Sequence, residues 1–417
     1  MNDSSYRLEL SCPQCGGPVE LEETDRIFGC PFCRVRLYVH CRGVCRYYLE
    51  PRSSLKSGLT MFVPYWRFKG LGYALTGLSV RHKVIDATTA AVTHKGFPLS
   101  LGVRPQALKL RFLVPSVRGL FLKPDMGRRD LLTHLGTIHL VVGRGRGGKT
   151  FSQAFVGEAF SLIYAPFVVR EGQLVDGITG KRLGNMAGSE KLPAARERGG
   201  KEPMAFVPTM CPQCGWDMQG DRGSLVLTCP HCDTVWSVRG AGLKPVRTAF
   251  YGDGTGCDLW LPFWRMQVEA RDLPLCTQGD FFRLTRLPRV VTPSHDQQPF
   301  AAWTPAFKLR PDTFLRLGRQ MTLDMMGRQV RSQDRLPREP FYPASLPMEE
   351  GKQSLPILIG DTTPAKRAVF PRLQECRFDL KDATLVYLPF RQRGSEMLQA
   401  ELGFALSAGN LRWGKWL

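Results

Sequence analysis

Cys12-Pro13-Gln14-Cys15-Gly16 is followed by Cys30-Pro31-Phe32-Cys33, and fourteen residues separate Cys15 from Cys30. The same arrangement with the same spacing returns as Cys211-Pro212-Gln213-Cys214-Gly215 and Cys229-Pro230-His231-Cys232. Two cysteines three positions apart on a tight turn direct both sulfurs toward one point, and two facing turns complete a tetrahedral set of four thiolates. This spacing predicts two zinc ribbons. The predicted ligands are Cys12, Cys15, Cys30 and Cys33 in the first ribbon, and Cys211, Cys214, Cys229 and Cys232 in the second.

A four-thiolate site has no open coordination position, so we expect two structural zinc ions that stabilise their hairpins and no catalytic residue in the ribbons. Iron bound as in rubredoxin is the alternative, although that family separates its cysteine pairs more widely. Cys41 and Cys45 follow the first ribbon, with His40 beside them. A third metal site there would lack further ligands, so the sequence favours free or partly buried thiols.

A second repeated stretch extends the resemblance between the two halves of the chain. Met61–Phe68 (MFVPYWRF) matches Leu259–Met266 (LWLPFWRM) at an offset of 198, against 199 for the ribbons. Three further pairs of segments keep the same order: Val114–Val117 with Thr304–Phe307, Leu122–Asp125 with Leu309–Asp312, and Leu162–Phe167 with Leu385–Phe390. Five landmarks in one order predict an internal tandem duplication.

Apolar and aromatic runs punctuated by Gly and Pro predict a β-rich α+β fold in each half. One helix is expected per half, at Arg128–Leu135 and at Asp312–Val330. The prolines in Val-Pro-Tyr-Trp and Tyr-Leu-Pro-Phe predict strands that lie at sheet edges or that begin at the proline, because proline lacks a ladder donor. The stretch Arg331–Gly351 is expected to be a long surface loop. The predicted organisation is a zinc ribbon at 1–45, a β-rich domain at 46–184, a linker at 185–205, a second ribbon at 206–240 and a second β-rich domain at 241–417.

Charge and composition limit the chemical classes of binding partner. The 417 residues carry a formal charge of +20, with 29 Lys/Arg against 15 Asp/Glu in residues 1–200 and 28 against 22 in the remainder. Such an excess favours an acidic partner: nucleic acid, an anionic membrane surface or an acidic protein. No signal peptide and no transmembrane segment is expected, so the predicted location is cytoplasmic, where zinc thiolates explain the cysteines better than disulfides do.

The octapeptide Gly143–Thr150 (GRGRGGKT) matches the phosphate-loop pattern, in which Lys149 would reach phosphates and Thr150 would hold magnesium. The next apolar run follows too soon for the helix that such a loop opens. The corresponding place in the second half, near Gly360–Pro364, has no such loop. A basic glycine-rich hairpin is therefore the favoured interpretation, with a phosphate-binding site as the alternative.

The ribbons resemble those of transcription factor and primosomal helicase zinc domains, a resemblance that implies zinc binding. The larger pattern adds Pro-aromatic-Trp, then Tyr-x-Pro-Phe, and in the first half the turn Gly177–Lys181. It is similar to a group of uncharacterised bacterial zinc-ribbon proteins, and this resemblance implies no activity.

Together these observations predict a zinc-binding, non-enzymatic scaffold or adaptor that mediates protein–protein assembly. The alternatives are a nucleic-acid-binding protein that uses its basic N-terminal half and a phosphate-loop nucleotide-binding protein. Five aromatic residues at matched positions could stack nucleic acid bases, but core packing is the favoured role: Tyr65, Trp66, Trp260, Phe263 and Trp264.

Overall fold

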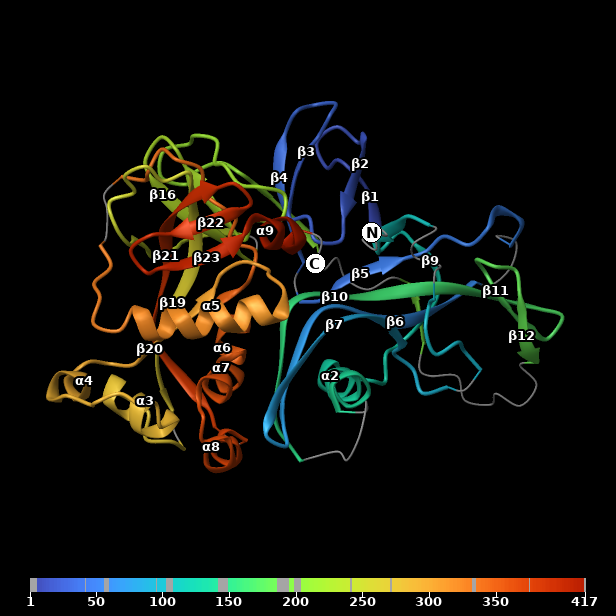
Figure 1. Ribbon diagram of the computed structural model, residues 1–417. Helices are drawn as coiled ribbons and strands as arrows, with labels where there is room; N and C mark the ends of the chain where they lie inside the picture. The colour runs from blue at the N-terminus through green and yellow to red at the C-terminus, as the bar shows by residue number, and fades with distance from the viewer. Residues whose placement is uncertain are drawn as a thin grey trace.

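The computed structural model shows a strand-rich α+β protein with one four-cysteine cluster in each half (Figure 1). It describes residues 6–41, 43–55, 60–94, 96–102, 108–141, 149–185, 195–198, 204–240, 242–270, 272–331, 335–374 and 376–415. Within this part of the chain, no helix is both long and apolar enough to span a bilayer.

The first half is built on an eleven-stranded sheet whose two longest members pair with each other. These are β6 (Thr60–Thr76) and β10 (Thr150–Arg170), which run antiparallel at its centre. The remaining strands are β1 (Arg7–Ser11), β2 (Pro18–Glu22), β5 (Cys45–Tyr48), β7 (Ser79–Ala90), β8 (Leu110–Phe112), β9 (Arg118–Leu122), β11 (Gln173–Asp176), β12 (Arg182–Asn185) and β13 (Ala195–Arg198). The helix α2 (Arg128–Gly136) packs Leu131 and Leu135 against one face of this sheet.

The second half has a six-stranded sheet centred on β19 (Leu259–Ala270) and β21 (Phe378–Arg393). Its other strands are β18 (Thr248–Phe250), β20 (Ala301–Pro305), β22 (Glu396–Gln399) and β23 (Phe404–Ser407). The helices of this half are α3 (Gln278–Thr285), α4 (Pro293–Gln297), α5 (Pro311–Asp324), α6 (Met348–Gln353), α7 (Leu355–Thr362), α8 (Lys366–Leu373) and α9 (Ala408–Gly414). Figure 1 shows these helices gathered beside and below the smaller sheet.

The central strand pairs of the two sheets have the same register. In the first half Trp66 lies opposite Leu162, and in the second Trp264 lies opposite Leu385. From these positions the pairing continues identically through six residues, to Met61 opposite Phe167 and Leu259 opposite Phe390. The two sheets therefore share a framework in which the Pro-aromatic-Trp strand pairs with the Tyr-x-Pro-Phe strand.

The repeated prolines lie inside strands that have a neighbouring strand on each side, so their predicted placement at sheet edges or at strand starts was wrong. Pro64 accepts a hydrogen bond from the Ala91 N–H (2.9 Å) but has no N–H to return to the Ala91 carbonyl. That carbonyl instead accepts the N–H groups of Asp125 (2.9 Å) and Met126 (3.2 Å). Because proline has no N–H, the Ala91 carbonyl remains available to the segment that leads into α2.

The second half repeats this arrangement. Pro262 accepts from the Ala306 N–H (3.0 Å), and the Ala306 carbonyl accepts from Ser345 and Leu346 (both 2.9 Å). In each half the nearby tryptophan then holds the same segment, because the Trp66 indole N–H donates to the Met126 carbonyl and the Trp264 indole N–H donates to the Leu346 carbonyl, both at 2.8 Å.

This hydrogen bonding corrects two of the sequence landmarks. Ala306 has the same hydrogen bonds in the second half as Ala91 has in the first. The segment Thr304–Phe307 therefore corresponds to residues 89–92 and not to Val114–Val117. Leu346 is in the same way equivalent to Met126. The segment equivalent to Leu122–Asp125 therefore lies just before Leu346 and not at Leu309–Asp312. The three landmarks with matching geometry are the ribbons, the Pro-aromatic-Trp strand and the Tyr-x-Pro-Phe strand.

The helix predictions were right in position and wrong in number. The first predicted helix is α2, and the second is α5, which ends at Asp324, before the expected Val330. One helix per half was wrong, because the second half contains α3 to α9. The stretch Arg331–Gly351 is also more than a surface loop, since it buries Tyr342, Ala344 and Leu346 and enters α6.

The range 185–205 is not free of regular structure, as a linker was expected to be. Residues 195–198 form β13, which pairs with β9. Met204 and Ala205 begin β14 (Met204–Pro208), which pairs with β4 (Arg36–Cys41) of the first ribbon. The chain therefore contacts both the first sheet and the first ribbon on its way to the second ribbon.

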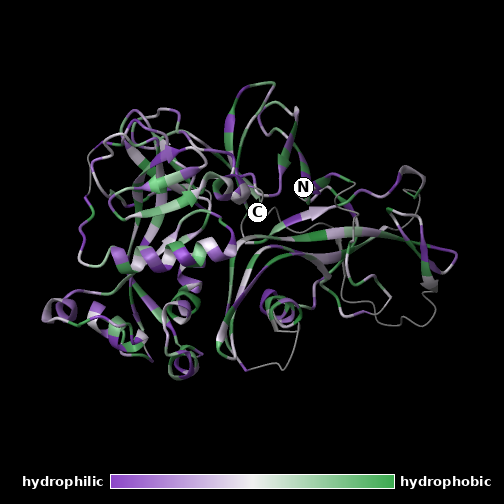
Figure 2. Ribbon diagram, in the orientation of Figure 1, coloured by the Kyte–Doolittle hydropathy of each residue, from purple (hydrophilic) through white to green (hydrophobic). Residues whose placement is uncertain are grey.

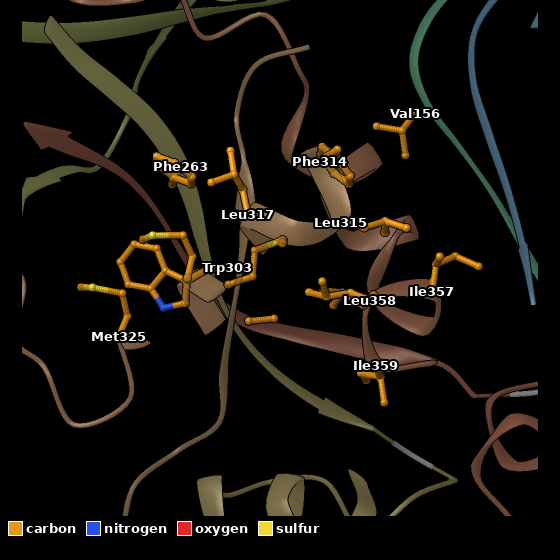
Figure 3. Close-up of a cluster of buried hydrophobic side chains, with 14 of the residues drawn as sticks. Val156, Phe263, Trp303, Phe314, Leu315, Leu317, Met325, Ile357, Leu358 and Ile359 are labelled. Carbon is orange, nitrogen blue, oxygen red and sulfur yellow. The ribbon is translucent and has the colours of Figure 1, made fainter. Parts of the chain in front are cut away.

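One hydrophobic cluster contains buried residues of both halves. Leu71, Tyr73 and Leu75 on β6 are buried in the same cluster as Phe314 of α5 and Leu358 of α7. Figure 3 shows Val156 of the first half together with Phe314 and Ile357 of the second. Figure 2 shows hydrophilic and hydrophobic residues interspersed along α5, as expected for a helix with one buried face.

Candidate metal centres

The first C-P-x-C turn of each ribbon closes in the same way. Gly16 and Gly215 donate their N–H to the carbonyls of Cys12 (2.8 Å) and Cys211 (2.9 Å), with φ of 75° and 73°. A glycine adopts this left-handed conformation without steric cost. At the second turn of each ribbon the left-handed residues are Arg34 and Asp233.

The four sulfurs of each quartet converge as predicted. The sulfur atoms within each group lie within 4.8 Å of one another. The Sγ–Sγ distances are 3.8 Å for Cys12–Cys33, 3.6 Å for Cys15–Cys30, and 3.5 Å for both Cys211–Cys232 and Cys214–Cys229. Tetrahedral zinc with Zn–S bonds of about 2.3 Å requires sulfurs about 3.8 Å apart, so both groups fit a metal ion.

Backbone N–H groups prepare the sulfurs for a cation. The N–H groups of Cys33 and Phe32 point at the Cys30 sulfur and lower the pKa of that thiol, whereas burial and the contacts with Cys15 and Cys30 raise the pKa of Cys33 in the same group. The inner cysteines Cys12, Cys30, Cys211 and Cys229 are buried. The two groups can therefore hold two ions without an open position for a substrate.

The ribbons pack against each other as one unit, which the sequence did not predict. Ile27 and Tyr38 of the first ribbon share a hydrophobic cluster with Met218 and Leu227 of the second. The Arg222 carbonyl of the second ribbon accepts the N–H groups of Arg26 (2.6 Å) and Ile27 (2.9 Å) of the first. The first ribbon contains β3 (Ile27–Gly29) and β4, and the second contains β15 (Val226–Cys229), β16 (Thr234–Arg239) and β17 (Gly242–Pro245).

The tips of the ribbons expose large side chains. Phe32 is 63% exposed and lies against Gly17, where an added Cβ would stand 2.4 Å from the phenylalanine ring. In the second ribbon Trp216 is 55% exposed and stacks on His231, with ring centroids 5.1 Å apart. Met210 is exposed beside the same turn. Trp216, His231 and Met210 are called the second ribbon tip below.

Cys41 and Cys45 form a disulfide, so the expectation of free thiols was wrong. The bond joins β4 of the first ribbon to β5 of the first sheet. Paired sulfurs are not available as thiolate ligands, and this excludes the third metal site considered from the sequence. Disulfides are uncommon in reducing compartments, and the cytoplasmic location stays a prediction.

The glycine-rich octapeptide does not have the surroundings of a phosphate loop. Residues 143–148 lie outside the described part of the chain, but Lys149 and Thr150 are within it. Thr150 begins the strand β10, whereas a phosphate loop must open a helix. Lys149 lies over the ring of Phe151, with its Nζ 5.5 Å from the ring centroid.

The matched aromatic residues belong mainly to the core, as favoured from the sequence. Tyr65, Trp66, Trp260 and Phe263 are buried, and Trp264 is half-buried against the core. They are therefore not exposed stacking platforms for bases.

The sequence did not reveal a buried ion pair on β6. Arg67 is fully buried, and its Nη2 lies 2.8 Å from Glu23 of the first ribbon. The guanidinium also contacts Asp86 on β7 and lies over the Tyr6 ring at 4.1 Å. The corresponding Arg265 is half-buried and lies 3.8 Å from Asp382. Only the matching Trp-Arg dipeptides in the two halves hinted at these positions.

In comparisons with known proteins, no family model, no curated protein and no solved structure matches the chain.

Proposed function

We propose that this protein is a zinc-stabilised, non-enzymatic assembly protein that docks a protein partner on its ribbons. The observation that carries the proposal is the exposed Trp216, stacked on His231 beside Met210 at the second ribbon tip. Aromatic and methionine side chains are enriched in the cores of protein interfaces, where they contribute large contact areas.

The charge of the ribbons favours a protein partner over nucleic acid. Residues 1–45 hold 5 Lys/Arg against 6 Asp/Glu, and residues 206–240 hold 2 against 3. A bound zinc ion with four thiolates adds about −2 to each ribbon. Nucleic acid binding draws most of its affinity from cations near phosphates, and the ribbons do not provide an excess of them.

Tetrahedral four-sulfur groups can hold zinc or iron, and the short separation of the cysteine pairs in each group favours zinc, because rubredoxin separates its pairs more widely. The proposal assigns each ion the task of fixing one ribbon. The shared register of β6–β10 and β19–β21 also supports an origin of the two halves by duplication, with the ribbons as the repeated N-terminal part of each half.

The test places a photo-crosslinking residue, p-benzoylphenylalanine, at position 216 of the full chain in its own cells. We expect a discrete crosslinked protein that is not formed from a matched substitution at the exposed Arg393. A second substitution at Phe32 asks whether the first ribbon shares the partner. Crosslinking to nucleic acid, or equal products from positions 216 and 393, contradicts the proposal.

A second candidate function is nucleic acid binding by the first sheet. Residues 46–184 hold 21 Lys/Arg against 7 Asp/Glu, a net charge of +14. Several of these cations are exposed, among them Lys83 on β7 and Arg129 on α2. If this surface binds polyanions, retention of the protein on duplex DNA or RNA falls steeply as salt rises, and Lys83→Glu with Arg129→Glu weakens it further. No retention of either polymer at low salt removes this candidate.

A further inference from the structure

An open hollow of about 370 Å³ lies where the two halves meet at the turn between β6 and β7. Three segments form its wall: this turn at Leu78, the C-terminal end of α3 at Arg286, and the start of α8 at residues 364–368. Figure 1 shows α8 beside this end of the two strands. Neither ribbon contributes to the wall, so the hollow is separate from the metal centres and from the second ribbon tip.

The charged side chains that line the hollow all have one sign. They are Arg286, Lys366 and Arg367, and no Asp or Glu is among the described residues of the wall. Arg286 and Arg367 are exposed. Within the described part of the chain, none of the three side chains makes a hydrogen bond or an ion pair. The three cations are therefore available to a ligand.

The acidic residues nearest to these cations along the chain have other partners. Asp361 of α7 lies 3.4 Å from Arg319. Asp280 accepts the N–H groups of Cys276 (3.0 Å) and Thr277 (2.9 Å) at the first turn of α3. Neither carboxylate lines the hollow, so an anionic ligand would find its positive charge unmatched.

Lys366 and Arg367 also stand at an unfavourable place for cations, the first turn of α8. The N–H groups of a first turn lack intrahelical partners and form the positive end of the helix dipole, which favours acidic side chains there. This turn has no acidic residue, and Ala365 at its N-cap supplies no side-chain acceptor. A bound anion would offset the repulsion and accept hydrogen bonds from the backbone.

The rest of the wall is apolar. It consists of Leu78, Pro364, Ala365 and Ala368, and the Leu78 side chain is 48% exposed. A fourth cation lies close by, because the Gly77 N–H donates to the Lys149 carbonyl (3.1 Å). Cations beside an apolar wall fit an ester of phosphate, whose charged group binds the guanidinium groups while its organic part contacts the wall.

We propose that this hollow binds the phosphate group of a phosphate ester through Arg286, Lys366 and Arg367. The planar guanidinium group of each arginine can donate to two phosphate oxygens at once. The ester is a free small molecule or part of a nucleic acid strand, and the experiment separates these two sources. This site is independent of the proposed docking of a protein on the ribbons.

The test measures the affinity of the full zinc-loaded chain for adenosine 5′-monophosphate carrying an N-methylanthraniloyl fluorophore on its ribose. Fluorescence anisotropy is recorded at neutral pH and constant ionic strength. We expect Arg286→Gln with Arg367→Gln to weaken binding at least roughly tenfold, because two charge-assisted contacts are lost. The matched control is Arg372→Gln with Arg377→Gln, which removes the same charge from two exposed residues outside the wall and should leave the affinity unchanged.

Unfolding in urea supplies a second readout. Arg367→Gln removes a cation from the positive end of α8, so the ligand-free variant should be at least as stable as the wild type. Weaker binding by a protein that is no less stable separates the loss of a ligand contact from a folding defect.

Competition identifies the source of the phosphate. Inorganic phosphate should displace the probe, whereas chloride at the same ionic strength should not. Single-stranded oligonucleotides with a 5′-phosphate or a 5′-hydroxyl are then added: equal competition by both assigns the backbone of a nucleic acid, competition by the first alone assigns a terminal phosphate, and competition by neither assigns a free small ester.

Three results overturn the proposal. They are no binding of the probe, no displacement by inorganic phosphate, and equal losses of affinity in the two double variants. The last result would mean that the probe responds to the overall charge of the protein and not to the hollow.

Discussion

The two halves of the molecule use the same strand framework around different interiors. Both pair a Pro-aromatic-Trp strand with a Tyr-x-Pro-Phe strand in one register, and both use the tryptophan indole to hold the segment before a helix. Next to that tryptophan, Arg67 is buried against Glu23 in the first half, whereas Arg265 is half-buried in the second. The strand register and the tryptophan hydrogen bond are thus common to both halves, whereas the burial of the neighbouring arginine differs between them.

The ribbons show the same division. The cysteine turns are alike, but the first ribbon contributes β1 and β2 to the eleven-stranded sheet, while β15 to β17 of the second form a sheet of their own. The first ribbon is therefore bound into its half more extensively than the second. The experiments below measure how far the two halves are equivalent.

Removal of one metal is expected to have the largest effect. Cys30→Ser and Cys229→Ser each replace a buried ligand, so each variant should retain about one zinc ion in place of about two. Loss of the ion should lower the free energy of unfolding by several kcal/mol. The decrease should be larger for Cys30→Ser, because the first ribbon is part of the larger sheet. Elemental analysis and denaturant unfolding measure both effects. A wild-type protein that is folded and free of metal contradicts the assignment of the two sites.

The matched arginines should differ strongly. Arg67→Met leaves Glu23 buried without its partner, and we expect a loss of about 3–5 kcal/mol in the free energy of unfolding. Arg265→Met removes a half-exposed contact and should cost about 0–1 kcal/mol. The double variant Arg67→Met with Glu23→Gln should recover part of the loss, because the buried charge at position 23 is removed and Asp86, which also contacts Arg67, is partly exposed to solvent. Equal losses at both arginines would show that burial of the first pair does not matter.

The matched tryptophans, in contrast, should behave alike. Trp66→Phe and Trp264→Phe each remove an indole donor from the carbonyl of Met126 or Leu346. A carbonyl left without its donor costs about 1–3 kcal/mol, so both variants should lose similar stability in urea unfolding. A loss confined to one variant would break the equivalence of the two frameworks.

The smallest effect is expected from the pH dependence of Glu350. Burial raises the pKa of this carboxyl group in the folded protein to about 7, above its ordinary value of 4.5, so between these values the folded state holds a proton that the unfolded state releases. The stability contributed by this group is therefore present below pH 4.5 and is lost as pH rises through 7. Lys308, Arg26 and Arg128 face the carboxyl group and moderate the effect.

Glu350→Gln should flatten the curve of stability against pH, by on the order of 2 kcal/mol across the interval from pH 5 to 7.5. The measurement is denaturant unfolding of both proteins at several pH values, with the variant curve subtracted from that of the wild type. Subtraction cancels the loss of metal that acid causes in both proteins. A difference curve that rises with pH would reverse the sign that burial of Glu350 requires.

The sequence predicted the metal groups well because their geometry is local. Cys12 and Cys15 lie on one turn, so the spacing alone determines where both sulfurs point. The same holds for α2 and α5, whose residues form short-range patterns. The packing of Ile27 on Leu227 joins segments that are far apart in the chain, and no local pattern encodes it.

The errors have physical causes of the same kind. Proline was expected at sheet edges because it lacks a donor, but Pro64 uses that property to leave the Ala91 carbonyl for Asp125 and Met126. Short similarities such as that between Val114–Val117 and Thr304–Phe307 were too brief to establish equivalence. Arg286 and Arg367 are far apart in the chain, and only the folded structure brings them to one hollow.

The hydrophobic cluster that spans both halves also affects co-translational folding. Leu71, Tyr73 and Leu75 are synthesised long before Phe314 and Leu358, which cover them in the finished molecule. Throughout that interval the nascent chain presents an apolar strand face to its surroundings, the kind of surface that chaperones bind and that aggregates recruit. A chain that ends before α5 keeps this face uncovered, so the first half needs the second half in order to fold stably.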